Sequence, residues 1–193
     1  FTIPQRGEKL DILELSQRNA KQYRLDTEKL RTLVDPERHT KRILNQMKED
    51  LNLPVLPEVI ECFDNSNFQG DYAVAAMTQF VNAKPNKNGY RHFNIKTVEG
   101  PNDFASMEEI IYRRYKRLLD EEQRLPDLIV VDGGKGQLSS AVKILQQLGL
   151  FGKISIIGIA EKLEEIYFPG DSIPLYIDKR SETLKVIQHI RDE

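Results

Sequence analysis

Two patterns of apolar positions divide the chain. Up to about residue 57 the apolar residues recur at a loose helical spacing, which sharpens after Asp35 and Pro36. Aspartate followed by proline is typical of a helix start, because aspartate caps free N–H groups and proline fits the first helical position. The clearest stripe comprises Ile43, Leu44, Met47 and Leu51. Pro54 and Pro57 end this pattern, so we expect an N-terminal helical arm and linker over residues 1–57.

Residues 58–193 begin with a strand pattern. Residues 59–64 and 72–81 are apolar with β-branched members, and residues 90–95 alternate after an Asn88-Gly89 turn. Three such segments separated by short connections predict an antiparallel meander of three strands.

A helical stripe follows the meander and stops near Leu125-Pro126. Two start signals compete for this helix: Ser106 with Glu109 forms a capping box, and Asp103 is an alternative cap. The apolar residues of the stripe are Phe104, Met107, Ile111, Tyr115 and Leu118.

The remainder of the chain alternates strand and helix. Residues 127–132 are a continuous apolar run between polar ends, typical of a parallel strand covered on both faces. A helix closed by Gly149 follows, then a buried strand over residues 154–159, and Ser181 caps a last helix. Three antiparallel strands followed by β-α-β-α predict an α/β domain, a mixed sheet flanked by helices, over residues 58–193.

Composition narrows the class of protein. The chain has 193 residues, 39% of them hydrophobic and 30% charged, as in ordinary globular proteins. Its longest apolar runs are far shorter than the roughly 20 residues of a membrane-spanning helix. Its one cysteine, Cys62, excludes an internal disulfide framework and a zinc site of several thiolates, and it fits a reducing cytoplasm.

Charge and the chain start add two expectations. The net charge of -2 argues against whole-surface attraction to nucleic acid, although a local basic face still binds phosphates. The first residues lack a basic segment followed by an apolar run, so we expect no signal peptide. The missing initiator methionine suggests a fragment of a longer protein.

Two aspartates stand at the carboxyl ends of predicted core strands. Asp64 ends the first strand of the meander, and Asp132 ends the parallel strand. Ligands usually sit at that edge of an open α/β sheet, and neighbouring strands about 4.8 Å apart would bring two carboxylates together around a cation. Oxygen ligands favour Mg²⁺ or Mn²⁺ over zinc. The alternative, that each aspartate merely ends a strand or caps a turn, has equal weight on spacing alone.

The loop after Asp132 is rich in glycine and leads straight into a predicted helix. Free N–H groups and the positive end of the helix dipole suit a phosphate there, which Gly134, Lys135 and Gly136 would hold. The spacing is not that of a Walker A loop or of the dinucleotide fingerprint. An ordinary glycine-rich turn from strand to helix is the alternative.

Other ionisable residues give weaker signals. The basic cluster over residues 113–117 is surrounded by acidic residues, which indicates a solvated, salt-bridged helix face. His39, His92 and His189 are isolated in sequence, and Cys62 lies in an apolar strand. We expect these four residues to be structural or at the surface.

Together these segments resemble the C-terminal RNase H-like endonuclease domain of the bacterial UvrC excinuclease family. The most specific segments of the resemblance are residues 61–66, Glu-Cys-Phe-Asp-Asn-Ser, and residues 126–138, which contain Asp-Gly-Gly-Lys-Gly-Gln. The resemblance extends along nearly the whole chain. Its further segments are residues 4–9, Gln69-Gly70, Met107 to Tyr115, Gly158-Ile159-Ala160 and Ile190 to Glu193.

The resemblance implies an RNase H-like nuclease that makes the 5′ incision beside a DNA lesion in nucleotide excision repair. Its implied partners are damaged double-stranded DNA and UvrB, with UvrA upstream. The family's active site is an Asp-Asp-His triad that binds divalent metal, and the two aspartates fall on Asp64 and Asp132. The family's histidine follows the Arg-Asp-Glu motif that ends this chain at Glu193, so the domain is expected to be cut before it.

Two positions depart from the family pattern. Asn67 stands where members often have histidine, and Glu161 stands where a lysine usually follows Gly-x-Ala. A second interpretation comes from another class: a non-catalytic RNase H-like scaffold that binds UvrB or DNA. Paired strand-end aspartates favour the nuclease, because a scaffold has no need of carboxylates that repel each other.

Overall fold

The chain divides into two units, Phe1–Lys41 and Arg42–Glu193. The computed structural model describes residues 4, 7–66, 74–96, 98, 102–160 and 164–193. The first unit contains the helix α1, Glu8–Val34, and the start of α2, Pro36–Asp50. The Asp35 carboxylate accepts the Arg38 N–H at 2.9 Å, which confirms the predicted cap of α2.

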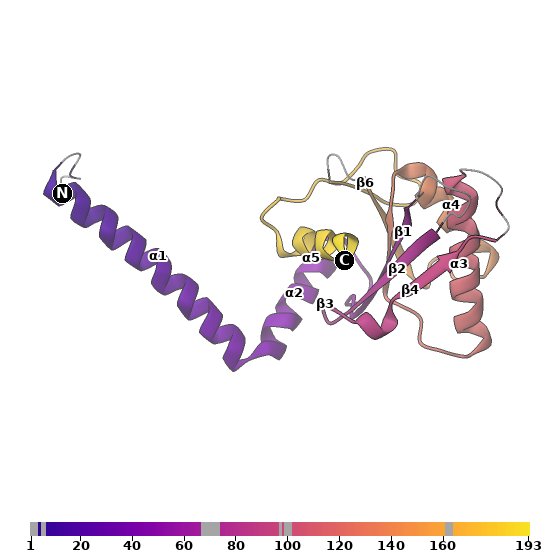
Figure 1. Cartoon of the computed structure of the whole chain (residues 1–193), viewed down its shortest axis with the longest axis horizontal. Coiled ribbons are helices and arrows are strands. Elements are labelled where there is room, and N and C mark those ends of the chain that lie inside the picture. Colours follow the sequence, from indigo (N-terminus) through magenta and orange to yellow (C-terminus); the bar gives the residue numbers. More distant parts are fainter. Residues whose placement is uncertain (1–3, 5–6, 67–73, 97, 99–101, 161–163) are drawn as a thin grey trace. The chain divides into compact units, whose positions relative to one another are not determined.

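The second unit is built on one mixed sheet, whose described strands number seven. They run in the order β3-β2-β1-β5-β6-β7, and β4 also pairs with β2 (Figure 1). β1 is parallel to β5, and β5 is parallel to β6, whereas β2, β3, β4 and β7 join by antiparallel pairing. The strands are β1 Val59–Ser66, β2 Val74–Val81, β3 Lys84–Pro85, β4 Arg91–Asn94, β5 Leu128–Asp132, β6 Ser155–Ala160 and β7 Glu165–Tyr167.

The predicted meander is present, but its third strand is divided. β3 and β4 both pair with β2, and the short 3₁₀ helix Lys87–Gly89 separates them. The chain reverses earlier than predicted, at Asn82 and Ala83, whose φ angles are +54° and +59°. Two consecutive positive φ angles are what a tight hairpin turn requires. The expected Asn88-Gly89 turn is therefore part of the 3₁₀ helix rather than the hairpin.

Three helices follow the meander: α3 Asp103–Asp120, α4 Lys135–Gln147 and α5 Glu182–Asp192. Both predicted caps of α3 are wrong: the Asn102 side chain accepts the Ala105 N–H at 3.1 Å, and Ser106 is buried inside the helix. The predicted cap of α5 is confirmed, because the Ser181 hydroxyl accepts the Thr183 N–H at 3.1 Å.

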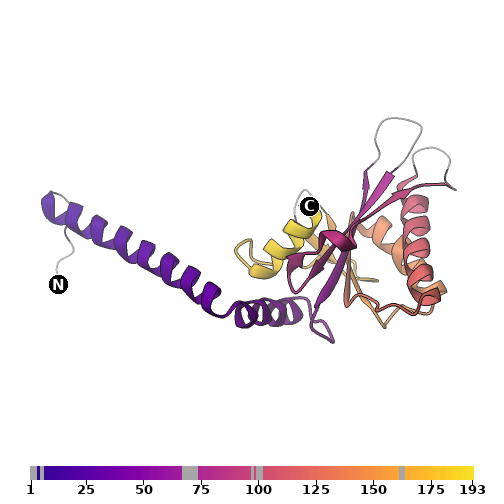
Figure 2. The same ribbon diagram turned by 60° about the horizontal axis from the view of Figure 1, so that its bottom comes forward.

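Helices cover the sheet on both faces, as the views in Figures 1 and 2 show. One core lies between the sheet and the pair α3 and α4, and it contains Phe63, Met77 and Val131. The other core lies under α5 and the second half of α2. The layers confirm the predicted mixed α/β sheet flanked by helices. The boundary predicted after residue 57 stays a prediction, although Met47 and Leu51 already belong to the second core.

Candidate active site

Strand register brings Asp64 and Asp132 to neighbouring strands at the same level. The parallel pairing of β1 with β5 runs up to Phe63 opposite Val131, so the next residue on each strand is the aspartate. Both aspartates are half-buried. Asp132 ends β5 as expected, but Asp64 does not end its strand, because β1 continues to Ser66 through its antiparallel pairing with β2. The juxtaposition expected from the sequence is therefore present in the fold, while the role of the pair stays a prediction.

Cys62 shows which face of the sheet the two carboxylates occupy. Successive residues of a strand point to opposite faces, so Asp64 shares the face of Cys62, which belongs to the core under α5. Burial raises the pKa of the Cys62 thiol, and the negative charges of Asp132 and Asp64 raise it further. The thiol is buried, as expected for a structural cysteine.

The C-terminal end of α5 is fastened to the same face. The Thr78 hydroxyl donates to the Ile190 carbonyl at 2.7 Å. Arg191 forms an ion pair with Glu164 at 3.2 Å, and the Tyr90 hydroxyl donates to Glu193 at 2.9 Å. Burial, together with this bond to Glu193, raises the pKa of Tyr90 to about 12. The positive charge of Arg191 lowers the pKa of the Cys62 thiol and the negative charge of Asp192 raises it, although burial dominates.

Metal-ligating side chains are sparse around this pair. Within the described part of the chain, no three histidine, cysteine, aspartate or glutamate side chains form a group that could hold a metal ion. His189 packs edge-on against the Phe80 ring at 5.0 Å between centroids, which agrees with a structural role. The two departures from the family pattern, Asn67 and Glu161, and the segment Gln69-Gly70 lie outside the described residues.

The glycine-rich loop places the start of α4 beside the end of β5. Gly133 has a φ of +153° and donates its N–H to the Ile159 carbonyl at 2.9 Å. Gly134 precedes the first turn of α4, whose leading N–H groups have no partner within the helix. A Cβ on Gly136 would lie 2.4 Å from the Phe104 ring, so the starts of α3 and α4 approach closely.

Lys135 has structural partners in the segment that follows β7. Its ammonium donates to the Ser172 carbonyl at 2.6 Å and lies 5.1 Å from the centre of the Tyr167 ring. A surface pocket of about 410 Å³ lies beside it, lined by α4 and residues 168–172. The phosphate-binding role of Gly134, Lys135 and Gly136 stays a prediction.

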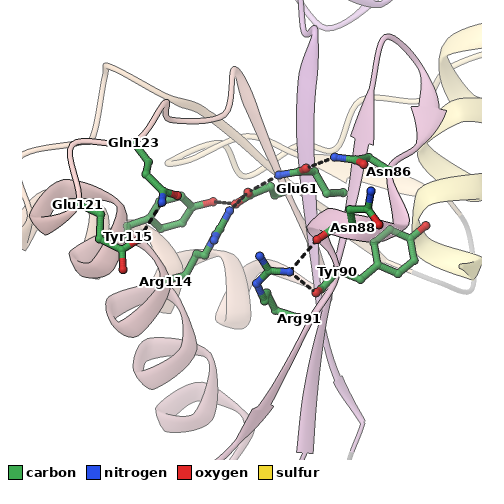
Figure 3. Close-up of polar contacts among 10 residues, drawn as sticks. Glu61, Asn86, Asn88, Tyr90, Arg91, Arg114, Tyr115, Glu121 and Gln123 are labelled. Atoms are coloured by element: carbon green, nitrogen blue, oxygen red, sulfur yellow. Dashed lines mark hydrogen bonds and ion pairs between the residues drawn. The ribbon is translucent and has the colours of Figure 1, made fainter.

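The sequence interpretation missed a buried polar network on the opposite face of β1, shown in Figure 3. Glu61 is 1% exposed. Its carboxylate accepts from the Arg114 guanidinium at 2.5 Å, the Tyr115 hydroxyl at 2.9 Å and the Gln79 amide at 3.0 Å. Asn86 extends the network by donating to Gln79 at 2.7 Å. Three described side chains therefore converge on Glu61, in the strand that carries Asp64, and Asn86 reaches it through Gln79.

Burial and charge oppose each other in this network. Burial alone would lower the pKa of Arg114, but the hydrogen bond and charge of Glu61 outweigh it and raise that pKa. Burial, followed by the charge of Glu61, raises the pKa of Tyr115 well above its usual value. Arg114 is therefore not part of the solvated helix face that the sequence suggested. Arg117, one turn on, is on that face: it is 67% exposed and pairs with Glu121 at 2.7 Å.

Comparison with known proteins assigns the family. Residues 48–193 match the model of the UvrC RNase H endonuclease domain. The whole chain is 67% identical to UvrABC system protein C of Flavobacterium psychrophilum and 65% and 64% identical to those of Flavobacterium johnsoniae and Christiangramia forsetii. The chain spans about a third (32%) of the length of each of these relatives.

Solved structures that align with this chain include an endonuclease V. The Ciona intestinalis endonuclease V, in complex with a 24mer DNA containing an inosine, aligns over 79% of this chain and 65% of its own, with a TM-score of 0.40 and 15% identity. The match to the family model covers the whole sheet and confirms the RNase H-like class expected from the sequence. The chain belongs to the UvrC RNase H endonuclease domain family.

Proposed function

We propose that this chain is the part of a UvrABC excision repair system that hydrolyses a DNA phosphodiester on the 5′ side of a lesion, with a divalent metal ion. The observation that carries the proposal is the position of Asp64 and Asp132, which lie directly after the paired stretch of the adjacent parallel strands β1 and β5, on one face of the sheet. Ligands in open α/β sheets bind at this edge.

The donor set fits a hard divalent cation. Mg²⁺ keeps several of its waters and is commonly bound by one or two carboxylates together with substrate phosphates, so two aspartates are sufficient protein ligands. Asp64 and Asp132 would hold Mg²⁺ or Mn²⁺. When bound, the ion activates a water and stabilises the leaving oxygen in phosphodiester hydrolysis.

The chain's other residues would orient the DNA. The first N–H groups of α4, at Gly134 to Gly136, start one residue after Gly133, and the N-terminus of a helix is suited to bind a phosphate, which here would lie near Asp132. Lys135 has three N–H donors, of which Ser172 takes one, so the ammonium retains capacity for a phosphate oxygen. Such contacts position DNA without reading its sequence.

The partners proposed for this function are damaged double-stranded DNA and UvrB, with UvrA acting earlier, in the cytoplasm. The family of the full-length relatives, UvrABC system protein C, supports this assignment. Among the residues that the structure describes, no helix is long and apolar enough to cross a bilayer.

Calorimetric titration with Mn²⁺ tests the metal site directly. The parent chain should bind Mn²⁺ saturably, and Asp64→Asn and Asp132→Asn should each abolish that binding while far-ultraviolet circular dichroism stays unchanged. Asp120→Asn is the matched control, because Asp120 is exposed at the end of α3 and pairs only with a surface lysine in the described structure. Undiminished Mn²⁺ binding by Asp64→Asn would refute the site.

Lys135→Ala tests the phosphate contact. Affinity for duplex DNA should fall with little dependence on sequence, and the slope of log affinity against log salt should become less steep by about 1. An unchanged slope would remove Lys135 from the DNA contact.

The second candidate is a scaffold that docks UvrB or DNA without cutting. It is favoured by one observation: the described residues supply two carboxylates but no third ligand near them. A chain that binds DNA but fails to bind Mn²⁺ in the calorimetric titration would support the scaffold.

A further inference from the structure

One row of paired residues crosses the sheet at the level of the active-site aspartates. Asp64 pairs with Ala76 on β2, and Ala76 pairs with His92 on β4. On the other side, Asp132 pairs with Ile159. Directly paired residues point to the same face of a sheet, so His92 shares the face of Asp64. The strands β1, β2 and β4 lie side by side in Figure 1.

Burial on the two faces of β4 supports this assignment. Phe93 and its partner Ala75 belong to the core that lies against α3 and α4. Because neighbours in a strand alternate, His92 and Asn94 point to the opposite face, where both side chains are exposed. Lys96 lies two residues beyond the end of β4 and is also exposed.

The segment around β4 is basic, although the chain as a whole is slightly acidic. Residues 82–96 contain four lysines and arginines and no aspartate or glutamate, whereas the whole chain has a net charge of -2. The acidic groups that contact this segment lie elsewhere: Glu193 pairs with Lys87 at 3.6 Å, and Glu109 of α3 accepts the Lys96 backbone N–H at 3.0 Å. Neither of these contacts involves the side chain of His92, Asn94 or Lys96.

We propose that the exposed surface formed by His92 and Asn94 of β4, together with Lys96 just beyond the strand, binds the phosphate backbone of the DNA strand whose phosphodiester lies at Asp64 and Asp132. An imidazole, an amide and an ammonium all donate hydrogen bonds to phosphate oxygens. The proposal rests on the proposed nuclease function, because it takes the DNA position from the aspartates.

The arrangement of the side chains assigns His92 to the DNA rather than to the metal. Two strand spacings of about 4.8 Å place the backbone of His92 about 10 Å from that of Asp64, with Ala76 between them. Among the described residues, His92 does not form a group with the two aspartates that could hold a metal ion. At a rise of about 3.4 Å per nucleotide, the same 10 Å spans about three nucleotides of one strand. We therefore expect the DNA strand to run along this row, from α4 across β1 and β2 toward β4.

A charge-matched pair of variants tests the proposal in the full chain. Lys96→Ala removes a positive charge from the proposed face. Lys84→Ala removes the same charge from the same edge of the sheet, but Lys84 pairs with Val81 at the far end of β2 and is the control. The measurement is fluorescence anisotropy with a labelled 20-base-pair duplex over a series of KCl concentrations.

The expected result separates the two lysines. Lys96→Ala should weaken duplex binding about eightfold at 0.1 M salt and reduce the salt slope by about 0.9, the contribution of one neutralised phosphate. Lys84→Ala should leave both unchanged. The double variant His92→Ala, Asn94→Ala removes no full charge, so it should weaken binding about fivefold with the slope retained.

Each other outcome overturns the proposal. Equal losses in Lys96→Ala and Lys84→Ala would mean that the edge attracts DNA only through its overall charge. Failure of the parent chain to bind the duplex even at 20 mM salt would also refute the β4 contact. The Mn²⁺ titration of Asp64→Asn judges the nuclease site separately, so a failure of the β4 contact is distinguished from a failure of the proposed function.

Discussion

Replacing Arg114 by methionine should show what the buried network contributes to stability. The methionine keeps an unbranched apolar stem, while the guanidinium that pairs with Glu61 is removed. The Glu61 carboxylate is 1% exposed and cannot turn to solvent, so it is left as a buried charge. The expected effect is therefore much larger than that of losing a surface ion pair.

The structure sets the expected size of the loss. Removing one partner of a buried ion pair costs about 3–5 kcal/mol. The lower end applies here, because Tyr115 and Gln79 still donate to Glu61, and because the Arg114 side chain is itself 12% exposed. A loss of about 3 kcal/mol corresponds to a fall in melting temperature of about 6–12 °C for a domain of this size.

Thermal unfolding followed by circular dichroism provides the measurement, with Arg117→Met as the control. Arg117 lies on the same helix in an exposed pair with Glu121, so its replacement should cost less than about 1 kcal/mol. Adding Glu61→Gln to Arg114→Met should restore part of the lost stability, because the orphaned charge is gone. Equal effects of the two arginine variants, or additive losses in the double variant, would refute this reasoning.

Three further outcomes are expected. Burial would raise the pKa of Asp50, but hydrogen bonds from Thr183 and Ser181 outweigh it and lower that pKa. The contribution of Asp50 to the free energy of unfolding is therefore present above the unfolded value near 3.8 and is lost as pH falls through the lower folded pKa. In acid unfolding, the stability of Asp50→Asn should depend less steeply on pH than that of the parent chain. Gly133→Ala should destabilise the fold by about 1–3 kcal/mol in urea unfolding, because a φ of +153° strains any side chain, and an unchanged midpoint would contradict this. Cys62 should not react with a thiol reagent until guanidinium unfolds the chain, since burial and two carboxylates raise its pKa; rapid labelling of the native chain would be inconsistent with that.

The parts of the fold that could be predicted were those with a strong local signal. The apolar segments that form β5 and β1 located both aspartates, because each aspartate stands directly after buried residues of its strand. The cap of α5 at Ser181 also followed from local chemistry. The hairpin at Asn82 and Ala83 did not, because alanine carries none of the turn signal that glycine gives at a positive φ.

The buried network could not be predicted from local charge patterns. Arg114 lies among other charged residues, and its partner Glu61 is 53 positions away in the chain. One signal was available: Arg114 follows Ile110 and Ile111 at helical spacing, on the buried stripe of α3. A charged residue on an apolar stripe predicts a buried partner, and Glu61, inside an apolar strand, was the matching candidate.

The alternation of Glu61 and Asp64 on the two faces of β1 has a consequence for how the sheet assembles. A slip of one residue in β1 would exchange the faces, so that Asp64 would enter the core beneath α3 and Glu61 would meet the apolar side chains beneath α5. Each carboxylate would then be buried without its partners, and apolar contacts do not compensate for the free-energy cost of burying an unpaired charge. The two carboxylates of β1 therefore disfavour the shifted register, and a sheet that pairs in that register during folding is too unstable to persist.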